Sequence, residues 1–483
     1  MAHSISFGTD GWRAIIADQF TFANVERVAY AAGLYVKETY YQGGATPPLL
    51  IGYDTRFLAD RFARRAAEVL LSMGIKVKIA HRDVPTPVIA FATQVEKTAG
   101  ALQLTASHNP PEYCGIKYIP HFAGPATNEI TDRIVSHLDA IPQGYDAPAA
   151  EVEEFNAQAA YFEAINKRID WQRIKDAKLK VACDTIYSTS RGYLDRLVED
   201  HKVTTKALHN WRDPLFGGGM PEPKREYLKE LIETIVSEGF DVGLSTDGDA
   251  DRFGIVGSKG EYYLPNQVLC LLARHLVKNH GMKGAIVRTV ATTHLLDHLA
   301  KAYGCELVET PVGFKYIGEV MRQKDVLIGG EQSGGVSFKG HIPEKDGILA
   351  DLLVLEMIAY EKKPLCEIWE DVLKDAGVRF YELRRDLHLT PVTQRVLIDH
   401  LQSKPFDRIG DLKVERVERM DGLKFYIDAD NWLLVRPSGT EPLVRLYFEG
   451  TSEERVQQMV SGFEKQVDQI IDDLKKQPAP AKA

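Results

Sequence analysis

Cysteine is scarce in this chain, and long apolar runs are missing. The five cysteines lie far apart and form no CxxC pair, which argues against a disulfide framework or a cysteine-rich zinc site. No segment approaches the roughly 18 consecutive apolar residues of a membrane span. The N-terminal stretch MAHSISFGTDGWRAII also lacks the basic head and apolar run of a signal peptide. We therefore expect a cytoplasmic protein with no membrane partner.

An excess of positive charge is absent as well. Lysine and arginine number 59 against 68 aspartates and glutamates, which gives a net charge of −9. Binding to nucleic acid needs a clustered basic surface, so we expect no nucleic-acid partner. A basic pocket for a small anion remains compatible with this balance, because net charge does not describe single pockets.

The length of 483 residues is more than one hydrophobic core usually serves, and it indicates three or four domains. Buried-strand patterns at 49–54 and 99–104 flank a helical pattern at 58–74, an alternation typical of parallel α/β layers. The alternation restarts after the small-residue stretch 146–151 and once more at Gly284. The sequence thus predicts three successive α/β units, with no clear sequence repeat between them.

Beyond Gly377 the character of the sequence changes. Strand-like stretches cluster there, and an amphipathic helical pattern at about 453–475 closes them. This part of the chain is expected to be an α+β domain. Residues 476–483 have the composition of a disordered tail.

The first unusual loop, TASHNPPEYCGIK at 105–117, follows an apolar strand pattern. Ser107 stands three residues beyond that strand, with His108 and Lys117 near it in the sequence. A polar turn is one reading of this loop. A serine hydrolase is poorly supported, because the G-x-S-x-G elbow is absent and a histidine next to the serine in sequence usually points away from it.

The second loop, STDGDADRFG at 245–254, places three carboxylates at alternate positions, on Asp247, Asp249 and Asp251. Charges of one sign at this density repel and need a neutralising partner. A hard divalent cation is such a partner, since it takes carboxylate oxygens and leaves positions open for a phosphate. An EF-hand is excluded because Arg252 and Ser258 stand where glycine and glutamate are required. An acidic surface turn is the simpler alternative.

The third loop, GGEQSGG at 329–335, offers Glu331 and Ser333 between glycines, a combination that suits sugar hydroxyls. An ordinary glycine turn explains it equally well. The fourth loop, RPSGTEPLVR at 436–445, combines two guanidinium groups, two hydroxyls and exposed backbone amides, as a phosphate cradle does. Its candidate contacts are Arg436, Ser438, Gly439, Thr440 and Arg445. Together the four loops indicate phosphoryl transfer to and from a sugar.

With the opening FGTDGWR, the motifs TASHNP, DGDADR, GEQSG and RPSGTEP make the chain resemble the α-D-phosphohexomutase superfamily, the phosphoglucomutase/phosphomannomutase enzymes. The resemblance spans nearly the whole chain, in the family's motif order. It implies an α/β fold of four domains around a central cleft: three similar α/β units with mixed sheets and an α+β C-terminal domain. The expected bounds are 1–150 for the phosphoserine loop domain, 151–257 for the metal loop domain, 258–375 for the sugar loop domain and 376–475 for the phosphate-binding domain, with 476–483 as a tail.

The resemblance also implies roles for single residues. Ser107 would carry the phosphoryl group and, with the three aspartates, bind Mg²⁺. Lys117 would be a candidate acid or base, and His108, Arg13 and Arg252 would join it in catalysis. The remaining candidates would contact substrate: Thr310, Gly313, Glu331, Ser333, His341, Arg436, Ser438, Gly439, Thr440 and Arg445.

The implied reaction moves a phosphoryl group between C1 and C6 of a hexose phosphate through phosphoserine and a 1,6-bisphosphate. Glucose phosphate with glucose 1,6-bisphosphate as intermediate is the first choice, because TPVGFK at 310–315 and GHIPEKDG at 340–347 resemble phosphoglucomutases. Mannose phosphate or dual use comes second, and glucosamine phosphate third. A sugar-phosphate sensor and a phosphatase are the alternatives. The resemblance is compatible with a monomer or a homodimer.

Two positions depart from the family pattern. Cys114 stands where many relatives have asparagine, and a thiol is the weaker hydrogen-bonding group. Gly335 stands where several bacterial relatives have histidine. His341 is the sequence's candidate for the missing imidazole.

Overall fold

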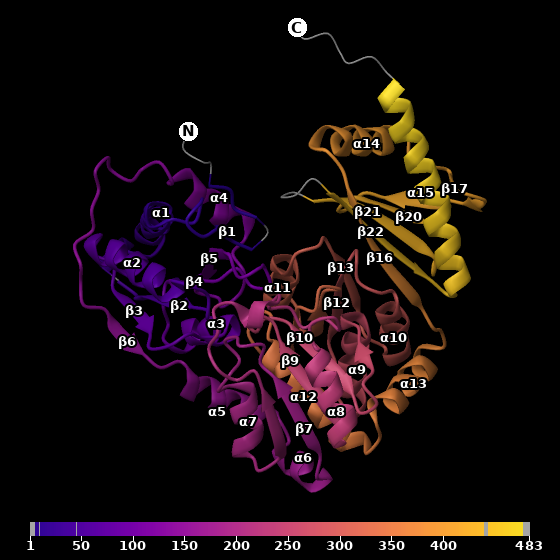
Figure 1. Ribbon diagram of the computed structural model, residues 1–483, viewed down its shortest axis with the longest axis horizontal. Coiled ribbons are helices and arrows are strands. Elements are labelled where there is room, and N and C mark those ends of the chain that lie inside the picture. The colour runs from indigo at the N-terminus through magenta and orange to yellow at the C-terminus, as the bar shows by residue number, and fades with distance from the viewer. Residues whose placement is uncertain (1–4, 9, 45, 439–442, 477–483) are drawn as a thin grey trace. The chain divides into compact units, whose positions relative to one another are not determined.

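The computed structural model describes residues 5–8, 10–44, 46–438 and 443–476 (Figure 1). The chain divides into two compact units. Unit 1 comprises Met1–Val287 and Gly313–Val372, and unit 2 comprises Arg288–Val312 and Leu373–Ala483. Among the described residues, none of the helices combines the length and the apolar character needed to cross a membrane.

The first sheet of unit 1 is mixed, with the strand order β1-β5-β4-β2-β3-β6. Strands β2, β3, β4 and β6 run parallel. Strand β5 pairs antiparallel to β4, and β1 pairs antiparallel to β5, so β1 runs in the same direction as β4. Strand β2, LLIGY, is almost wholly buried, as expected for a strand covered on both faces. The elements are β1 (Trp12–Ile15), α1 (Phe22–Tyr40), η1 (Gln42–Gly44), β2 (Leu49–Tyr53), α2 (Ala59–Ser72), β3 (Val77–Ala80), α3 (Thr86–Val95), β4 (Gly100–Leu104), β5 (Tyr113–Pro120), α4 (Asn128–Ser136) and β6 (Glu153–Phe155).

The second sheet repeats this plan with the order β11-β10-β9-β7-β8. Strands β8, β7 and β9 are parallel. Strand β10 pairs antiparallel to β9, and β11 pairs antiparallel to β10. The elements are α5 (Gln158–Arg168), α6 (Trp171–Ala177), β7 (Lys180–Asp184), α7 (Leu194–Asp200), β8 (Thr204–Leu208), η2 (Phe216–Gly218), α8 (Lys229–Glu238), β9 (Val242–Thr246), β10 (Phe253–Gly257) and β11 (Tyr262–Tyr263).

The third sheet has the order β13-β12-β14-β15, with β14 and β15 antiparallel. Helix α12 is apolar nearly all round and buried along its length, as a helix in the middle of a large core must be. The elements are α9 (Pro265–Lys278), β12 (Ala285–Thr289), α10 (Leu295–Tyr303), β13 (Leu307–Thr310), α11 (Phe314–Gln323), β14 (Val326–Gly330), β15 (Val336–Phe338), α12 (Gly347–Glu361) and α13 (Leu365–Ala376).

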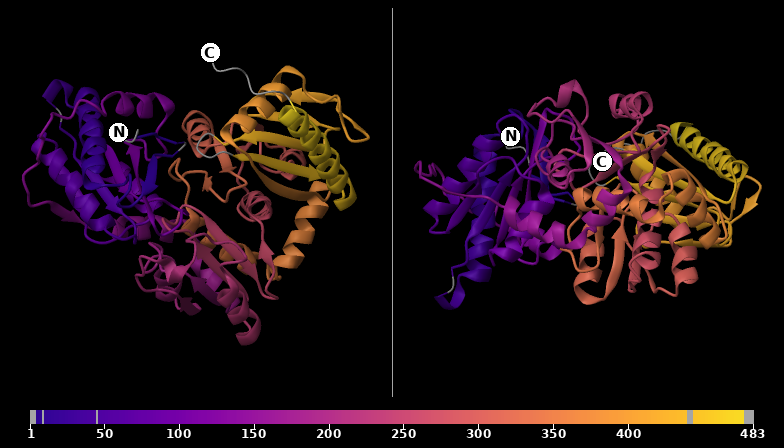
Figure 2. Two further views of the ribbon diagram at one scale, coloured as in Figure 1. Left: turned by 45° about the horizontal axis from the view of Figure 1, so that its top comes forward. Right: turned by 90° about the horizontal axis from the view of Figure 1, so that it is seen from below.

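The C-terminal sheet is antiparallel, with the order β16-β22-β21-β20-β19. Helix α15, the yellow helix in Figure 2, lies along this sheet. The apolar face of α15 packs on it in one core that includes Phe425, Phe448 and Phe463. This domain is α+β, as the sequence predicts. The elements are β16 (Tyr381–His388), α14 (Pro391–Ser403), β17 (Arg408–Ile409), β18 (Leu412–Lys413), β19 (Arg416–Glu418), β20 (Leu423–Tyr426), β21 (Trp432–Pro437), β22 (Leu443–Gly450) and α15 (Glu453–Lys476).

One supersecondary feature positions three of the four unusual loops. Each lies in an antiparallel strand pair, after β4, after β9 and after β14, before the returning strands β5, β10 and β15. A parallel strand delivers its loop at its carboxyl end, where ligands bind in open α/β sheets. The first three sheets therefore present their polar loops at equivalent places, although the sequence shows no repeat.

Candidate active site

Ser107 is held in a strained conformation immediately beyond β4. Its φ of 51° lies in the left-handed region. This conformation is energetically unfavourable for any residue other than glycine. The hydroxyl of Thr105 accepts the Ser107 backbone N–H at 2.9 Å, and the residue is only 1% exposed. Its Oγ donates to Asp247 Oδ2 at 2.9 Å. Strain of this kind commonly accompanies a functional side chain.

Arg56 holds the loop that carries Ser107, which we call the serine loop, by hydrogen bonds to its backbone. This arginine follows β2 and is fully buried, with Nε paired to Asp54 at 2.9 Å. Its two terminal nitrogens donate to four loop carbonyl oxygens, of Ser107, Asn109, Pro110 and Tyr113, at 2.6 to 2.9 Å. Sequence analysis missed it, although an arginine in YDTR just past a buried strand was a visible signal.

The three aspartates after β9 converge as the sequence predicts. Asp247, Asp249 and Asp251 are buried, with carboxylate oxygens within 4.8 Å of one another. The chain turns between them at Ala250, whose φ of 58° is again left-handed. Asp249 Oδ1 and Asp251 Oδ1 have no hydrogen-bond partner in the described part of the chain. Buried oxygens without donors fit a hard divalent cation.

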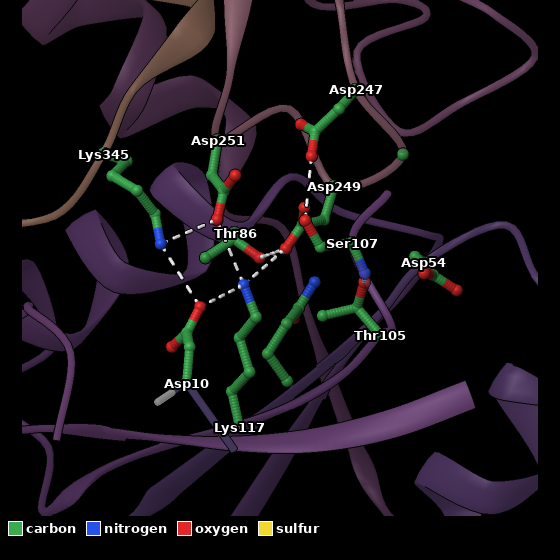
Figure 3. Close-up of polar contacts among 12 residues, drawn as sticks. Asp10, Asp54, Thr86, Thr105, Ser107, Lys117, Asp247, Asp249, Asp251 and Lys345 are labelled. Atoms are coloured by element: carbon green, nitrogen blue, oxygen red, sulfur yellow. Dashed lines mark hydrogen bonds and ion pairs between the residues drawn. The ribbon is translucent and has the colours of Figure 1, made fainter. Parts of the chain in front are cut away.

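Two lysines and a fourth carboxylate complete the cluster (Figure 3). Lys117 Nζ, from β5, lies 2.9 Å from Asp10, 2.8 Å from Asp249 and 3.1 Å from Asp251. Lys345 Nζ, just before α12, lies 3.0 Å from Asp251 and 3.2 Å from Asp10. Sequence analysis named neither Asp10 nor Lys345, although both stand in motifs that it quoted.

Burial and charge set the protonation of this cluster. Burial raises the pKa of Asp247 well above its usual value, and the charges of Asp251 and Asp249 add to this. Burial also opposes the charge of Asp251, but Lys117 and Lys345 outweigh it and lower the pKa of this carboxyl. The carboxylates in turn raise the pKa of Lys117 against the effect of burial. Lys117 is therefore a fixed positive charge in this state.

The other catalytic candidates lie around the same loops. Arg13 donates to Asn109 Oδ1 at 2.8 Å, so it joins the serine loop. His108 Nδ1 lies 3.3 Å from Ser107 Oγ, and burial, followed by the Arg252 charge, lowers the pKa of its imidazole. The backbone N–H of Arg252 donates to Asp247 Oδ1 at 3.1 Å, while its guanidinium lies 3.6 Å from Glu222.

Lys345 fills the space beside Gly335. A Cβ added to Gly335 would lie 2.6 Å from Lys345 Cδ and 2.9 Å from Cγ, so a histidine here would displace the lysine. His341 is placed elsewhere. Its Nε2 lies 2.8 Å from Asp346 Oδ2, its ring stacks on Phe91, and its side chain is 1% exposed. Lys345 is thus the cation that lies beside both Gly335 and the triad.

The sugar-binding candidates of unit 1 lie in and beside the turn between β14 and β15. Glu331 is buried, and its Oε1 accepts the Gly313 N–H at 2.9 Å. Ser333 is exposed in the turn between β14 and β15. An isolated backbone bridge joins Gly335 to Arg252, so the sugar loop and the metal loop support each other.

In unit 2 the two arginines of the fourth loop come from neighbouring strands. Arg436 on β21 and Arg445 on β22 are direct cross-strand partners. Arg436 Nε donates to Asp421 Oδ2 at 2.9 Å, and the Val312 N–H donates to that same oxygen at 2.9 Å. Ser438 and Thr310 are buried in this unit. Gly439 and Thr440 lie outside the described residues.

Four domain descriptions from one family match the chain. They are the phosphoglucomutase/phosphomannomutase α/β/α domains I, II and III, at residues 4–144, 159–260 and 264–376, and the C-terminal domain of those enzymes, at residues 404–466. The chain belongs to the phosphoglucomutase/phosphomannomutase family. The acidic triad and the serine loop of this phosphohexomutase, an enzyme of the isomerase class, fall in the matched domains II and I.

Individual relatives agree on the family and differ in substrate. A phosphoglucomutase/phosphomannomutase of Thermococcus kodakarensis is 30% identical over 94% of this chain and 96% of its own length. A phosphoglucosamine mutase of Clostridium kluyveri is 29% identical over 94% of this chain and 96% of its own. A crystal structure provisionally named as a phosphomannomutase, from Thermus thermophilus, has a TM-score of 0.85 and 34% identity over 97% of this chain and all of its own.

Proposed function

We propose that this phosphohexomutase interconverts glucose 1-phosphate and glucose 6-phosphate through a phosphoserine at Ser107 and glucose 1,6-bisphosphate. The observation that carries the proposal is the position of Ser107. Its backbone is strained, the residue is buried, and its hydroxyl lies 2.9 Å from the Asp247 carboxylate of the acidic triad. A hydroxyl beside a cation site is the arrangement expected of a residue that accepts and returns a phosphoryl group.

The triad supplies the cation site in this proposal. Asp247, Asp249 and Asp251 would hold Mg²⁺, which when bound would neutralise negative charge on the transferring group. Lys117 and Lys345 contribute two further fixed charges next to the triad. Because the carboxylates raise the pKa of Lys117, we propose charge stabilisation and hydrogen-bond donation as its role, which keeps it the candidate acid.

Substrate recognition follows from the remaining loops. Glu331 has its Oε1 anchored by the Gly313 N–H, which leaves Oε2 as an acceptor for a sugar hydroxyl. The Arg436 and Arg445 pair supplies the two guanidinium forks for the phosphate that is not reacting. The phosphate that is not reacting is attached to C6 in one half of the reaction and to C1 in the other. Arginine side chains are long, so they can reach the phosphate in both orientations of the sugar.

Glucose phosphate is the proposed substrate, and glucosamine phosphate is the second candidate. The Gln332 of GEQSG and the Clostridium kluyveri relative favour glucosamine, whereas TPVGFK and the segment that carries Lys345 favour glucose. Purified protein should be assayed on glucose, mannose and glucosamine 1-phosphates, each with Mg²⁺ and a trace of its 1,6-bisphosphate. A preference for glucosamine or mannose would overturn the glucose assignment and leave the mutase assignment intact.

The phosphoserine step has its own test. Incubation with glucose 1,6-bisphosphate should add one phosphoryl mass to the intact chain, and Ser107→Ala should abolish both this mass and the mutase turnover. Ser333→Ala, a serine in the exposed sugar loop, is the matched control and should retain the phosphoryl mass. Full turnover by Ser107→Ala would overturn the mechanism, and release of the label to water alone would indicate a phosphatase.

A further inference from the structure

A second group of metal-ligand side chains lies outside the acidic triad. His275 near the end of α9, His280 just beyond it and Glu356 in α12 place their donor atoms within 4.8 Å of one another. We refer to these three residues as the histidine–glutamate cluster. Both imidazole Nε2 atoms lie 2.9 Å from the same oxygen, Glu356 Oε2.

We propose that the histidine–glutamate cluster binds a first-row transition metal such as Zn²⁺ or Co²⁺. Two imidazole nitrogens and one carboxylate oxygen are the donors that such ions prefer, whereas Mg²⁺ and Ca²⁺ prefer oxygen alone. The all-oxygen triad and this nitrogen-rich cluster therefore select different ions. The metal would join two long helices of unit 1.

The distances suit an ion after a small adjustment. Bonds of about 2.0 to 2.2 Å to nitrogen and oxygen at near-tetrahedral angles separate neighbouring ligand atoms by roughly 3.3 to 3.5 Å. The two Nε2 atoms lie 2.9 Å from Glu356 Oε2, so each moves by a few tenths of an ångström. The His280 side chain is 18% exposed, whereas those of His275 and Glu356 are fully buried, so an ion would enter beside His280.

Groups around the cluster already fix its orientation. Glu356 Oε1 accepts the backbone N–H of Asp170 at 2.6 Å, which directs Oε2 toward the imidazoles. The ring of Tyr360 lies against both histidines, with centroids 5.6 Å and 5.4 Å away. Such outer contacts orient the ligands of metal sites and raise their affinity.

Binding of an ion also requires a change of proton position. Asn279 Nδ2 lies 3.0 Å from His275 Nδ1 and 3.1 Å from Glu361 Oε1, so in this state Nδ1 accepts and Nε2–H faces Glu356. With a metal on Nε2 the proton moves to Nδ1, and the Asn279 amide turns to offer its oxygen. His280 gives up its Nε2 proton.

The experiment is a titration of the full chain with Co²⁺ in excess Mg²⁺, which keeps the triad saturated. We expect a visible absorption band that saturates at one equivalent and a higher melting temperature with bound metal. His280→Gln should remove the band and keep its mutase turnover, which also shows that it folds. His298→Gln is the matched control, because this partly exposed histidine pairs with Asp430 outside the cluster.

A second variant tests the proton argument. Asn279→Ala removes the amide N–H that holds His275 Nδ1 as an acceptor, and we expect it to tighten Co²⁺ binding by a few-fold because Nδ1 can then carry the proton. The proposal is overturned if the wild-type chain shows no saturable band, or if His280→Gln keeps the band unchanged. Either result would leave the cluster as a hydrogen-bonded contact between helices.

Discussion

At the scale of single residues, the active site depends on buried charges that balance one another. Asp10, Asp249 and Asp251 share two ammonium groups, on Lys117 and Lys345, within 3.2 Å. Removing one partner from such a set leaves a buried charge uncompensated, which typically costs about 3–5 kcal/mol. Each lysine therefore contributes both to folding and to the field at Ser107.

Replacing Lys345 tests its share of that field. Lys345→Met keeps the aliphatic stem and removes the charge, so we expect kcat to fall by about 100-fold, or about 2.7 kcal/mol of transition-state stabilisation. Steady-state kinetics at saturating substrate measure this. Lys339→Met, which removes surface contacts with Asp325 and with the Lys283 carbonyl oxygen, should retain wild-type kcat. Equal kcat values in the two variants would contradict a contribution of the Lys345 charge to catalysis.

Arg56 offers a second prediction, about geometry. Arg56→Lys keeps the charge but loses the planar fork that reaches four carbonyl groups. We expect the rate of Ser107 phosphorylation to fall by roughly 10- to 100-fold, because a displaced nucleophile loses its alignment. Intact-mass measurements after rapid mixing with glucose 1,6-bisphosphate give the rate.

The control for Arg56 is Arg61→Lys, on the exposed face of α2, where the side chain is 70% exposed. A wild-type phosphorylation rate in Arg56→Lys would mean that the loop does not need its brace.

Sequence reasoning reached some of these residues and missed others for a physical reason. Ser107 and the three aspartates stand together in short motifs, so their chemistry is visible locally. Asp10 and Lys345 are 335 positions apart and meet only through the fold. An aspartate or a lysine by itself indicates no particular role, so these two residues could be recognised only after the fold brings their side chains together.

At the scale of elements, the equivalent hairpins β4–β5, β9–β10 and β14–β15 explain why the polar loops occur where they do. The strand patterns at 49–54 and 99–104 predicted β2 and β4 well, since buried parallel strands are continuous apolar runs. The returning strands were less visible, because β5 and β10 begin inside the polar loops themselves and β15 begins directly after the third loop. Their equivalence lies in pairing, which a sequence without a repeat does not reveal.

A contact between elements of unit 2 gives the third prediction. Asp421 Oδ2 accepts from Arg436 Nε and from the Val312 N–H of the TPVGFK loop, so one carboxylate orients both. Asp421→Asn keeps an acceptor and loses the charge. We expect KM for glucose 1-phosphate to rise by about 10-fold with little change in kcat, since the guanidinium loses its anchor.

Steady-state kinetics over a range of substrate concentrations separate these effects. Asp430→Asn, an aspartate that pairs with the partly exposed His298, is the control and should keep the wild-type KM. A fall in kcat with an unchanged KM for Asp421→Asn would contradict a positioning role.

At the scale of the whole molecule, unit 2 joins segments far apart in the sequence around a buried lysine. Lys424 Nζ donates to the Val290 carbonyl at 2.8 Å and lies 2.8 Å from His294 Nε2 and 3.4 Å from Glu309. It also lies 3.9 Å above the Trp432 ring. Burial, followed by the Arg288 charge, lowers the pKa of Lys424 to about 8.

This pKa gives the fourth prediction. Between about pH 8 and the usual lysine value near 10.5, the unfolded chain binds a proton that the folded chain lacks, so stability rises with pH in this window. The full effect is about 3 kcal/mol. Hydrogen exchange of β20 and β21 amides should show this rise relative to Lys424→Met. Parallel pH dependence of the two proteins would contradict it.

The left-handed backbone at Ser107 restricts how this enzyme can evolve. Threonine carries the same hydroxyl and would be a chemically competent nucleophile, but its β-branched side chain is strongly disfavoured at positive φ. Glycine would relieve the backbone and lose the hydroxyl. Almost no substitution at this position therefore keeps both the backbone conformation and the hydroxyl. Selection on the shape of the turn preserves serine there as firmly as selection on the chemistry does.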